Sequence, residues 1–147
     1  MNQYKELKDR QQAAFNEYAK DHLFFAFSEK QFAEGMKKFG LKPTDENKIG
    51  SMGAGGFYLK EEKQALISLF REQREELEAA IEADQTGDGF IYDMFLYELQ
   101  NHEYCITLDI TDALNAVGLT AEQINASPAL MNGLKRAVNE ASKGAFD

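Results

Sequence analysis

The stretch "DQTGDGFIYDMF", residues 84–95, separates two helical patterns of apolar residues. A stripe with helical spacing precedes it and consists of Leu66, Leu69, Phe70, Leu77, Ala80 and Ile81. A second stripe begins inside it and consists of Ile91, Met94, Phe95 and Leu99. Gly87 and Gly89 can adopt the positive φ angles with which a chain leaves a helix. The sequence therefore predicts a long helix over 61–83, a glycine turn, and a second helix capped by Asp88.

The rest of the chain alternates helix signals with short strand signals. Further helices are predicted at 3–20, 28–39, 111–118 and after Thr120 and Pro128, where "SEKQ" (28–31) and "TAEQ" (120–123) match the capping box. Strands are predicted at 23–28 and, as a hairpin around Gly53 to Gly56, at 48–60, with a third strand candidate at 104–110. We expect an α+β fold: a small, helix-rich single domain over 1–147 with a short β-sheet packed against helices.

The aromatic run "LFFAFS" (23–28) is the most hydrophobic of these strand signals. Alternation along a strand places Phe25 and Phe27 on one face and Phe24 and Ala26 on the other. Because neither face carries a charged side chain, we expect this strand to be buried on both sides.

The composition is typical of a globular protein that works inside the cell without a cofactor. Hydrophobic residues make up 44% of the chain, which is enough for a packed core. No apolar run approaches the roughly 18 residues of a membrane span, and the polar start "MNQYKELKDRQQ" lacks the apolar core of a secretory signal. Cys105 is the single cysteine, which disfavours a disulfide framework or a Cys-rich zinc site. We expect a cytoplasmic protein with no membrane association.

The net charge of −9 is concentrated in one segment. Residues 72–112 contain 12 acidic side chains and one basic side chain, Arg74. This density argues against direct nucleic-acid binding, which needs Lys and Arg against the phosphates. It fits a basic protein partner, including a nucleic-acid-binding protein that an acidic surface could occupy. The candidate interaction face consists of Glu72, Glu75, Glu76, Glu78, Glu82 and Asp88.

The turn itself suggests a second function, because residues 84–91 resemble half of an EF-hand calcium loop. Asp84, Thr86 and Asp88 stand at ligand positions 1, 3 and 5, with Gly89 at the required glycine position. Position 12, which supplies a bidentate Glu in EF-hands, is Phe95 on the apolar stripe. The next acid on that helix, Glu98, lies about one turn too far along. A divalent-cation module at 84–92 is therefore an alternative that lacks its dominant ligand.

The pair His102 and Cys105 in "NHEYC" (101–105) suggests a third function, a Cys–His hydrolase. On one helix the two residues would share a face, but Glu103 would point about 100° away and could not orient the histidine. His102 also continues the stripe of Leu99, which favours a half-buried structural role. We therefore assign no catalytic residue.

Three phrases, "LFFAFSEKQFAEGMKKFG", "SMGAGGFYLK" and "FLYELQNHEYCITLDITDALNAVGL", are similar to a family of small uncharacterised proteins from phages and mobile elements of gut bacteria. The resemblance covers about residues 20–135 and includes no motif of known chemistry, so it implies no site residues. It implies an accessory protein, of the kind that engages a nucleic-acid machine as inhibitors of bacterial defence systems do.

These observations lead to one function hypothesis with two alternatives. We expect a non-enzymatic accessory or regulatory protein that acts by protein–protein contact through the acidic segment 72–112. The divalent-cation module at 84–92 and the Cys–His hydrolase are the alternatives, and the sequence leaves homo-oligomerisation open.

Overall fold

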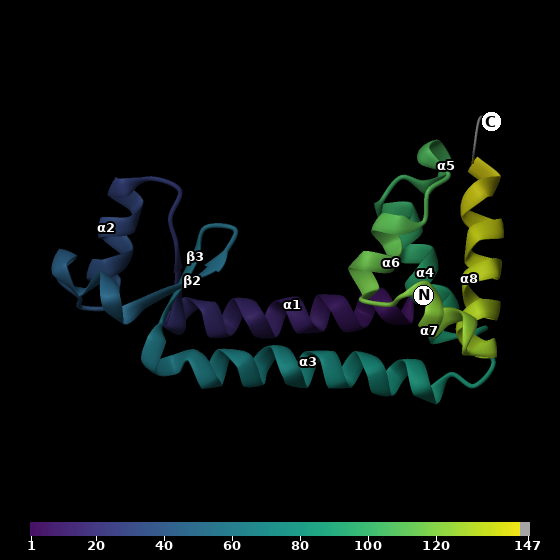
Figure 1. The fold of residues 1–147 in the computed structure, drawn as a ribbon, viewed down its shortest axis with the longest axis horizontal. Helices are drawn as coiled ribbons and strands as arrows, with labels where there is room; N and C mark the ends of the chain where they lie inside the picture. The colour runs from purple at the N-terminus through teal and green to yellow at the C-terminus, as the bar shows by residue number, and fades with distance from the viewer. Residues whose placement is uncertain (145–147) are drawn as a thin grey trace. The chain divides into compact units, whose positions relative to one another are not determined.

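The elements of the computed structural model, which describes residues 1–144, follow the apolar patterns and caps of the sequence (Figure 1). The helices and strands are α1 (Gln3–His22), β1 (Leu23–Phe25), α2 (Glu29–Lys38), β2 (Ile49–Gly53), β3 (Gly56–Leu59), α3 (Lys63–Ala83), α4 (Phe90–Asn101), α5 (Tyr104–Thr107), α6 (Thr111–Val117), α7 (Ala121–Asn125) and α8 (Pro128–Ala141). Short 3₁₀ helices are η1 (Pro43–Lys48), η2 (Lys60–Glu62) and η3 (Ser142–Gly144). The predicted helix-rich α+β class is confirmed. No helix in residues 1–144 combines the length and the apolar character that a membrane span requires.

The contacts of the chain gather in two compact units. Unit 1 consists of Met1–Arg10 and Glu75–Asp147, and unit 2 consists of Gln11–Arg74. Because the boundaries fall inside α1 and α3, each unit contains part of both helices. The single domain predicted over 1–147 stays a prediction.

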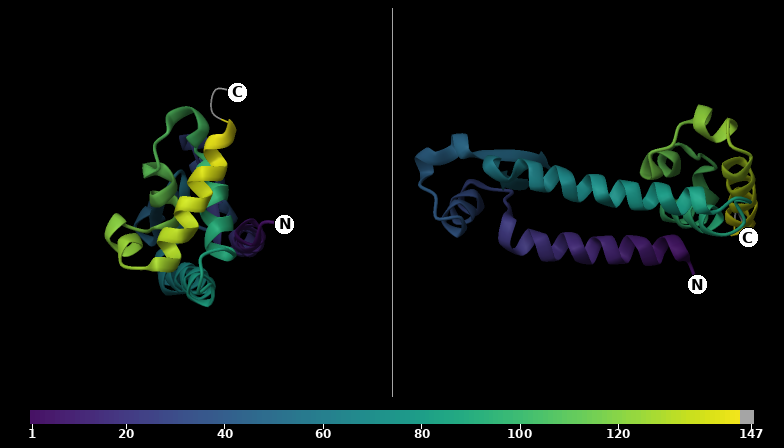
Figure 2. Two further views of the ribbon diagram at one scale, coloured as in Figure 1. Left: turned by 90° about the vertical axis from the view of Figure 1, so that its right-hand side faces the viewer. Right: turned by 90° about the horizontal axis from the view of Figure 1, so that it is seen from below.

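Helix α4 lies at the centre of the core of unit 1 and packs against α6 and α8 (Figures 1 and 2). Its stripe residues Ile91, Met94, Phe95 and Leu99 are all 0% exposed. The other buried apolar residues of this core are Tyr4, Leu7, Phe90, Tyr104, Ala113, Val117, Ile124, Leu130, Leu134, Ala137 and Ala141. Full burial of one such side chain contributes roughly 1.5–3 kcal/mol. The stripe read from the sequence is thus the face on which unit 1 is assembled.

Unit 2 is built on an antiparallel sheet with the strand order β1-β3-β2. The predicted hairpin in 48–60 is confirmed: β2 and β3 pair up to Gly53 and Gly56. Ala54 and Gly55, between them, both have positive φ (51° and 79°), which matches the twist of a two-residue hairpin turn. A small core of Phe24, Ala26, Met36 and Ile49 lies between the sheet and α2.

The expectation that strand 23–28 is buried on both sides is wrong. The strand β1 ends at Phe25; Leu23 and Phe24 are buried within it, and Ala26 is buried just after it. Phe25 and Phe27 are 48% and 78% exposed. The physical reason is that β1 is an edge strand. Its Phe24 face packs on the small core of unit 2, whereas the opposite face is covered at Leu23 and open to solvent from Phe25 onward.

The strand proposed at 104–110 is also wrong. The segment forms α5, a single helical turn between Glu103 and Leu108, which have left-handed φ angles of 55° and 56°. A strand needs a neighbour whose backbone groups it can pair with. The sheet strands of residues 1–144 all belong to unit 2, whereas this segment belongs to unit 1.

The close contact between α4 and α8 leads to a stability prediction. A Cβ added at Gly133 would lie 2.4 Å from Cγ2 of Ile91 and 2.8 Å from the carbonyl oxygen of Gly87. Gly133→Ala should therefore lower the free energy of unfolding by about 1–3 kcal/mol, the usual effect of overpacking. Helix propensity alone would raise it by up to about 1 kcal/mol. Urea unfolding, monitored by circular dichroism, shows whether the free energy of unfolding falls or rises.

The control is Asn139→Ala, at an exposed position on the same helix. We expect this variant to match or slightly exceed the parent in stability. If Gly133→Ala is as stable as the control, α4 and α8 do not pack in this way.

Candidate functional site: the acidic face of α3 and the turn that follows it

The glutamates of the predicted interaction face on α3 are all exposed; they are Glu72, Glu75, Glu76, Glu78 and Glu82. Within unit 1, Glu75, Glu78 and Glu82 are three and four residues apart and therefore share one stripe of the helix. Leu77, Ala80 and Ile81 face the other way and pack on the core. The amphipathic pattern of the sequence thus orients these three carboxylates toward solvent.

Two of these carboxylates already interact within the chain. Glu76 accepts hydrogen bonds from Nη1 of Arg10 on both oxygens (3.0 and 2.9 Å), which ties α1 to α3 inside unit 1. Glu78 also has an interaction within the chain. The side chains of Glu75 and Glu82 make no hydrogen bond or ion pair with any residue in 1–144. These two are the carboxylates most available to a partner.

The turn after α3 is organised by the carboxylate of Asp84. Its Oδ2 accepts from the backbone N–H groups of Gly89 (3.1 Å) and Ile91 (2.9 Å), and its Oδ1 accepts from that of Gly87 (3.0 Å). Burial alone would raise the pKa of Asp84, but these backbone donors and that of Thr86 together hold it below its usual value. The prediction that Asp88 caps the second helix is therefore wrong, because Gly89 is the N-cap residue of α4 and Asp84 accepts the N–H groups of Gly89 and of Ile91 in its first turn.

Asp88 instead joins the turn to α8. Its Oδ1 accepts from Nδ2 of Asn132 (2.7 Å) and from Nη1 of Arg136. The bond from Arg136 and then that from Asn132 lower the pKa of Asp88. Asn132 also donates to the carbonyl oxygen of Thr86 (2.7 Å). Asp88 therefore serves the packing of unit 1, and its charge is matched by an arginine of the same unit.

The calcium hypothesis places Asp84, Thr86 and Asp88 around a cation, but in the structure the carboxylates of the two aspartates have other partners. Asp84 is bound to backbone donors and Asp88 to Arg136, whose guanidinium also lies over the ring of Tyr92 (5.7 Å). Phe95, at the twelfth position, is 0% exposed. In residues 1–144, no group of three or more His, Cys, Asp and Glu side chains could hold a metal ion. The arrangement favours a structural turn, and cation binding stays a hypothesis to be tested.

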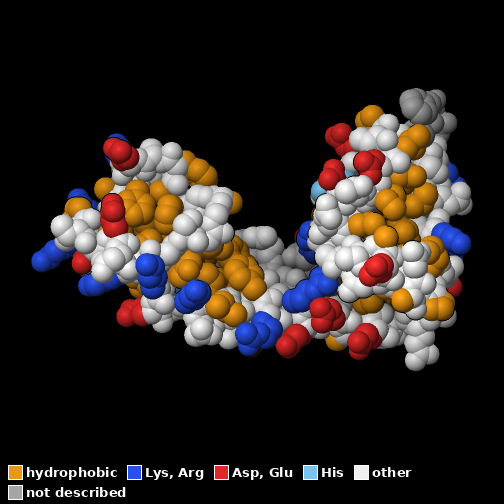
Figure 3. Space-filling view, viewed as in Figure 1, with side chains coloured by type: hydrophobic (Ala, Val, Ile, Leu, Met, Phe, Trp, Pro, Cys, Tyr) orange, Lys and Arg blue, Asp and Glu red, His pale blue; other side chains and the backbone are white. Residues whose placement is uncertain are grey.

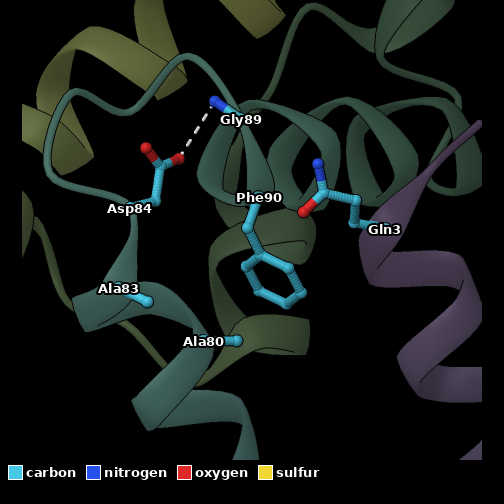
Figure 4. Close-up of a pocket in the computed structure, with 6 residues that line it drawn as sticks. All are labelled: Gln3, Ala80, Ala83, Asp84, Gly89 and Phe90. Atoms are coloured by element: carbon cyan, nitrogen blue, oxygen red, sulfur yellow. Dashed lines mark hydrogen bonds between the residues drawn. The ribbon is translucent and has the colours of Figure 1, made fainter.

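A pocket of about 360 Å³ opens beside this turn (Figure 4). It is lined by Gln3, Ala80, Ala83, Asp84, Gly89 and Phe90, all in unit 1. In Figure 4 the carboxylate of Asp84 points toward the N–H of Gly89. Because Asp84 is already engaged by backbone donors, the pocket offers a ligand little polar chemistry beyond the amide of Gln3.

The structure does not combine His102 and Cys105 into a catalytic pair. Helix α4 ends at Asn101, and Glu103 has a left-handed conformation before α5 begins. The assumption that one helix carries both residues is therefore wrong. Neither side chain makes a hydrogen bond to the other in the described residues 1–144. The hydrolase alternative has no nucleophile–base contact to support it.

Among residues 1–144, Glu98 is the one charged residue that is buried, and the sequence patterns assign it to no site. Glu98 is 1% exposed, accepts from the hydroxyl of Tyr4 (3.2 Å) and lies 3.7 Å from Nζ of Lys8. Its Oε1 has no hydrogen-bond partner in residues 1–144. A signal for it exists in the sequence, because Glu98 follows Ile91 by seven residues and Met94 by four and so falls on the apolar stripe. It anchors the first turns of α1 to α4.

A family of unknown function, DUF7659, matches residues 3–140 of the chain. The chain belongs to this family. The matched range includes the acidic face, the turn, and both α8 residues that hold Asp88. No curated protein and no solved structure matches the chain. Family membership therefore assigns no activity to the site.

The bonds of Asp84 lead to a prediction with a defined pH dependence. Asp84→Asn should destabilise the protein by about 1–3 kcal/mol at neutral pH, because an amide offers one acceptor oxygen where a carboxylate offers two. A lowered pKa in the folded state stabilises the fold above the unfolded value of about 3.9. This contribution is lost as the pH falls through the lower folded pKa. The difference in the free energy of unfolding between parent and variant should therefore become smaller as the pH is lowered. Urea unfolding at several pH values measures this difference.

The calcium hypothesis has its own test. We expect no saturable heat when millimolar calcium is titrated into the protein in a calorimeter, and no rise in melting temperature. Arg136→Gln, which removes the guanidinium next to Asp88, is the matched variant for the same titration. Saturable binding by the parent that Asp88→Asn abolishes would establish a cation site at 84–92.

Proposed function

We propose that this protein is a non-enzymatic accessory protein that binds a basic surface of a partner protein through the acidic face of α3. The observation that carries the proposal is the stripe of Glu75, Glu78 and Glu82, which α3 presents to solvent on the side opposite its core contacts. A helix rises about 1.5 Å per residue, so the three carboxylates follow one another over roughly 10 Å. A rigid row of like charges suits a partner with a complementary row of Lys and Arg.

The distribution of charge in the two units supports this choice of surface. Unit 1 contains 16 acidic and six basic side chains, whereas unit 2 contains nine acidic and ten basic ones. The negative field therefore belongs to unit 1, where it raises the rate of encounter with a basic partner and repels nucleic acid. The partner that we propose is a nucleic-acid-binding protein whose basic groove the acidic face occupies. This fits an accessory protein of phage or mobile-element type that inhibits such a protein.

The proposal predicts the effect of reversing this charge. Glu75→Lys, Glu78→Lys and Glu82→Lys, combined in one variant, should weaken binding to the partner by about tenfold or more, because each attraction becomes a repulsion. Glu76 is left unchanged because it lies off this stripe and accepts hydrogen bonds from Arg10. The partner is captured from a lysate of the native host at low salt and identified by mass spectrometry, and its affinity for the parent and the variant is then measured with purified protein.

The matched control reverses three exposed glutamates elsewhere, Glu34, Glu61 and Glu122, and so changes the net charge by the same amount. This control should retain the partner, and circular dichroism should show that both variants are folded. Equal binding by both triple variants would mean that net charge, and not the face of α3, attracts the partner. Binding by the α3 variant as tight as that of the parent would refute the proposal.

A further inference from the structure

A second surface with binding chemistry lies in unit 2, at a pocket of about 460 Å³. It is lined by Ala26, Ser28, Glu29, Phe32, Glu46 and Phe57. These residues come from the link between β1 and α2, from α2 itself, from η1 and from β3. The volume lies within the range of about 300–1,000 Å³ that is usual for small-ligand pockets.

The apolar part of the pocket is an aromatic cluster that the fold holds in place. Phe32 meets Phe57 edge to face with ring centroids 5.1 Å apart, and Phe57 stacks on the buried Phe24 at 5.2 Å. Phe32 and Phe57 are only partly buried and so keep exposed ring surface. Figure 3 shows hydrophobic side chains open to solvent over α2, with acidic side chains at their edge. The pocket therefore offers π-electron faces that are rigid before any ligand arrives.

The polar part of the pocket is a pair of carboxylates without internal cations. Glu29 lies in the first turn of α2 and Glu46 in η1, and both are exposed. Neither side chain makes a hydrogen bond or ion pair with any residue in 1–144. Lys48, the lysine nearest to Glu46 in the sequence, is paired with Asp45 at 3.5 Å. Two negative charges thus remain beside an aromatic surface in a unit whose overall charge is close to zero.

We propose that this pocket binds an arginine side chain of a partner protein. A guanidinium is planar and weakly hydrated, so it can stack on an aromatic face while its N–H groups bond to carboxylates. The pocket supplies both kinds of group from elements far apart in the sequence. A purely apolar side chain is a poorer occupant, because it would remove water from Glu29 and Glu46 without replacing the lost hydrogen bonds. The site is separate from the acidic face of α3 and does not rest on the function proposed for it.

The test uses short peptides as probes and the ¹⁵N-labelled full chain. Acetylated and amidated Gly-Arg-Gly should shift the backbone amide signals of Glu29, Phe32, Glu46 and Phe57 in a saturable manner. Glu29→Gln combined with Glu46→Gln should weaken this binding by about fivefold, in line with the modest strength of exposed ion pairs. The matched control, Glu34→Gln with Glu61→Gln, makes the same change in charge at exposed residues outside the pocket lining and should bind as the parent does.

The other probes decide between occupants. Gly-Lys-Gly should bind more weakly than the arginine peptide, since an ammonium lacks the planar stacking surface, and Gly-Leu-Gly should not bind. A leucine peptide that binds as well as the arginine peptide, shifts confined to other residues, or equal binding by the double pocket variant would each overturn the proposal. The α3 triple-lysine variant should still bind the arginine peptide, so failure of one proposal is distinguishable from failure of the other.

Discussion

The capping of α4 by Asp84 is the constraint on which the rest of unit 1 depends. Four of the residues that this helix buries are fully inaccessible to water, and they contact segments from both ends of the chain. The helix can lie there only if the turn before it has a fixed direction. The carboxylate of Asp84 provides this by accepting three backbone N–H groups between Gly87 and Ile91. Because charged hydrogen bonds are stronger than neutral ones, a single side chain can hold a turn of this length.

The same turn is held from the other side by α8. Gly87 has a φ of 87°, and a Cβ at that position would lie 2.0 Å from the carbonyl oxygen of Ala129, so a side chain has no room there. Asn132 and Arg136 add hydrogen bonds to Thr86 and Asp88. A sequence that resembles half a calcium loop is thus folded around donors from its own chain: backbone amides take up one carboxylate, and an arginine neutralises the other.

The charged surfaces follow from how this core is built. Since Leu77, Ala80 and Ile81 direct one side of α3 to the core, Glu75, Glu78 and Glu82 must face solvent. In unit 2 the core between the sheet and α2 is small, so Phe32 and Phe57 at its edge stay partly exposed next to Glu29 and Glu46. One unit therefore carries an extended acidic stripe and the other a small aromatic pocket with two carboxylates. Both surfaces are negatively charged. We propose that the acidic stripe binds a row of basic side chains and that the pocket binds one planar guanidinium group.

Local patterns in the sequence were enough to predict the helices other than α5, the β2–β3 hairpin, the capping box at Thr120, the Ser28 cap of α2 and the buried stripe of α4. Each depends on residues a few positions apart, such as Thr120 with Gln123 or Ile91 with Phe95. The strand at 104–110 and the burial of both faces of 23–28 were mispredicted. Whether a segment pairs as a strand, and whether its faces are covered, depends on which other segments of the chain lie next to it. The partners of Asp88 could not be predicted either, since Arg136 is 48 residues away and carries no local signal. The sequence by itself determined which side chains could form a core and which could form a charged surface. The tertiary structure alone decided which carboxylates are paired with a cation, because that depends on distances between segments far apart in the chain.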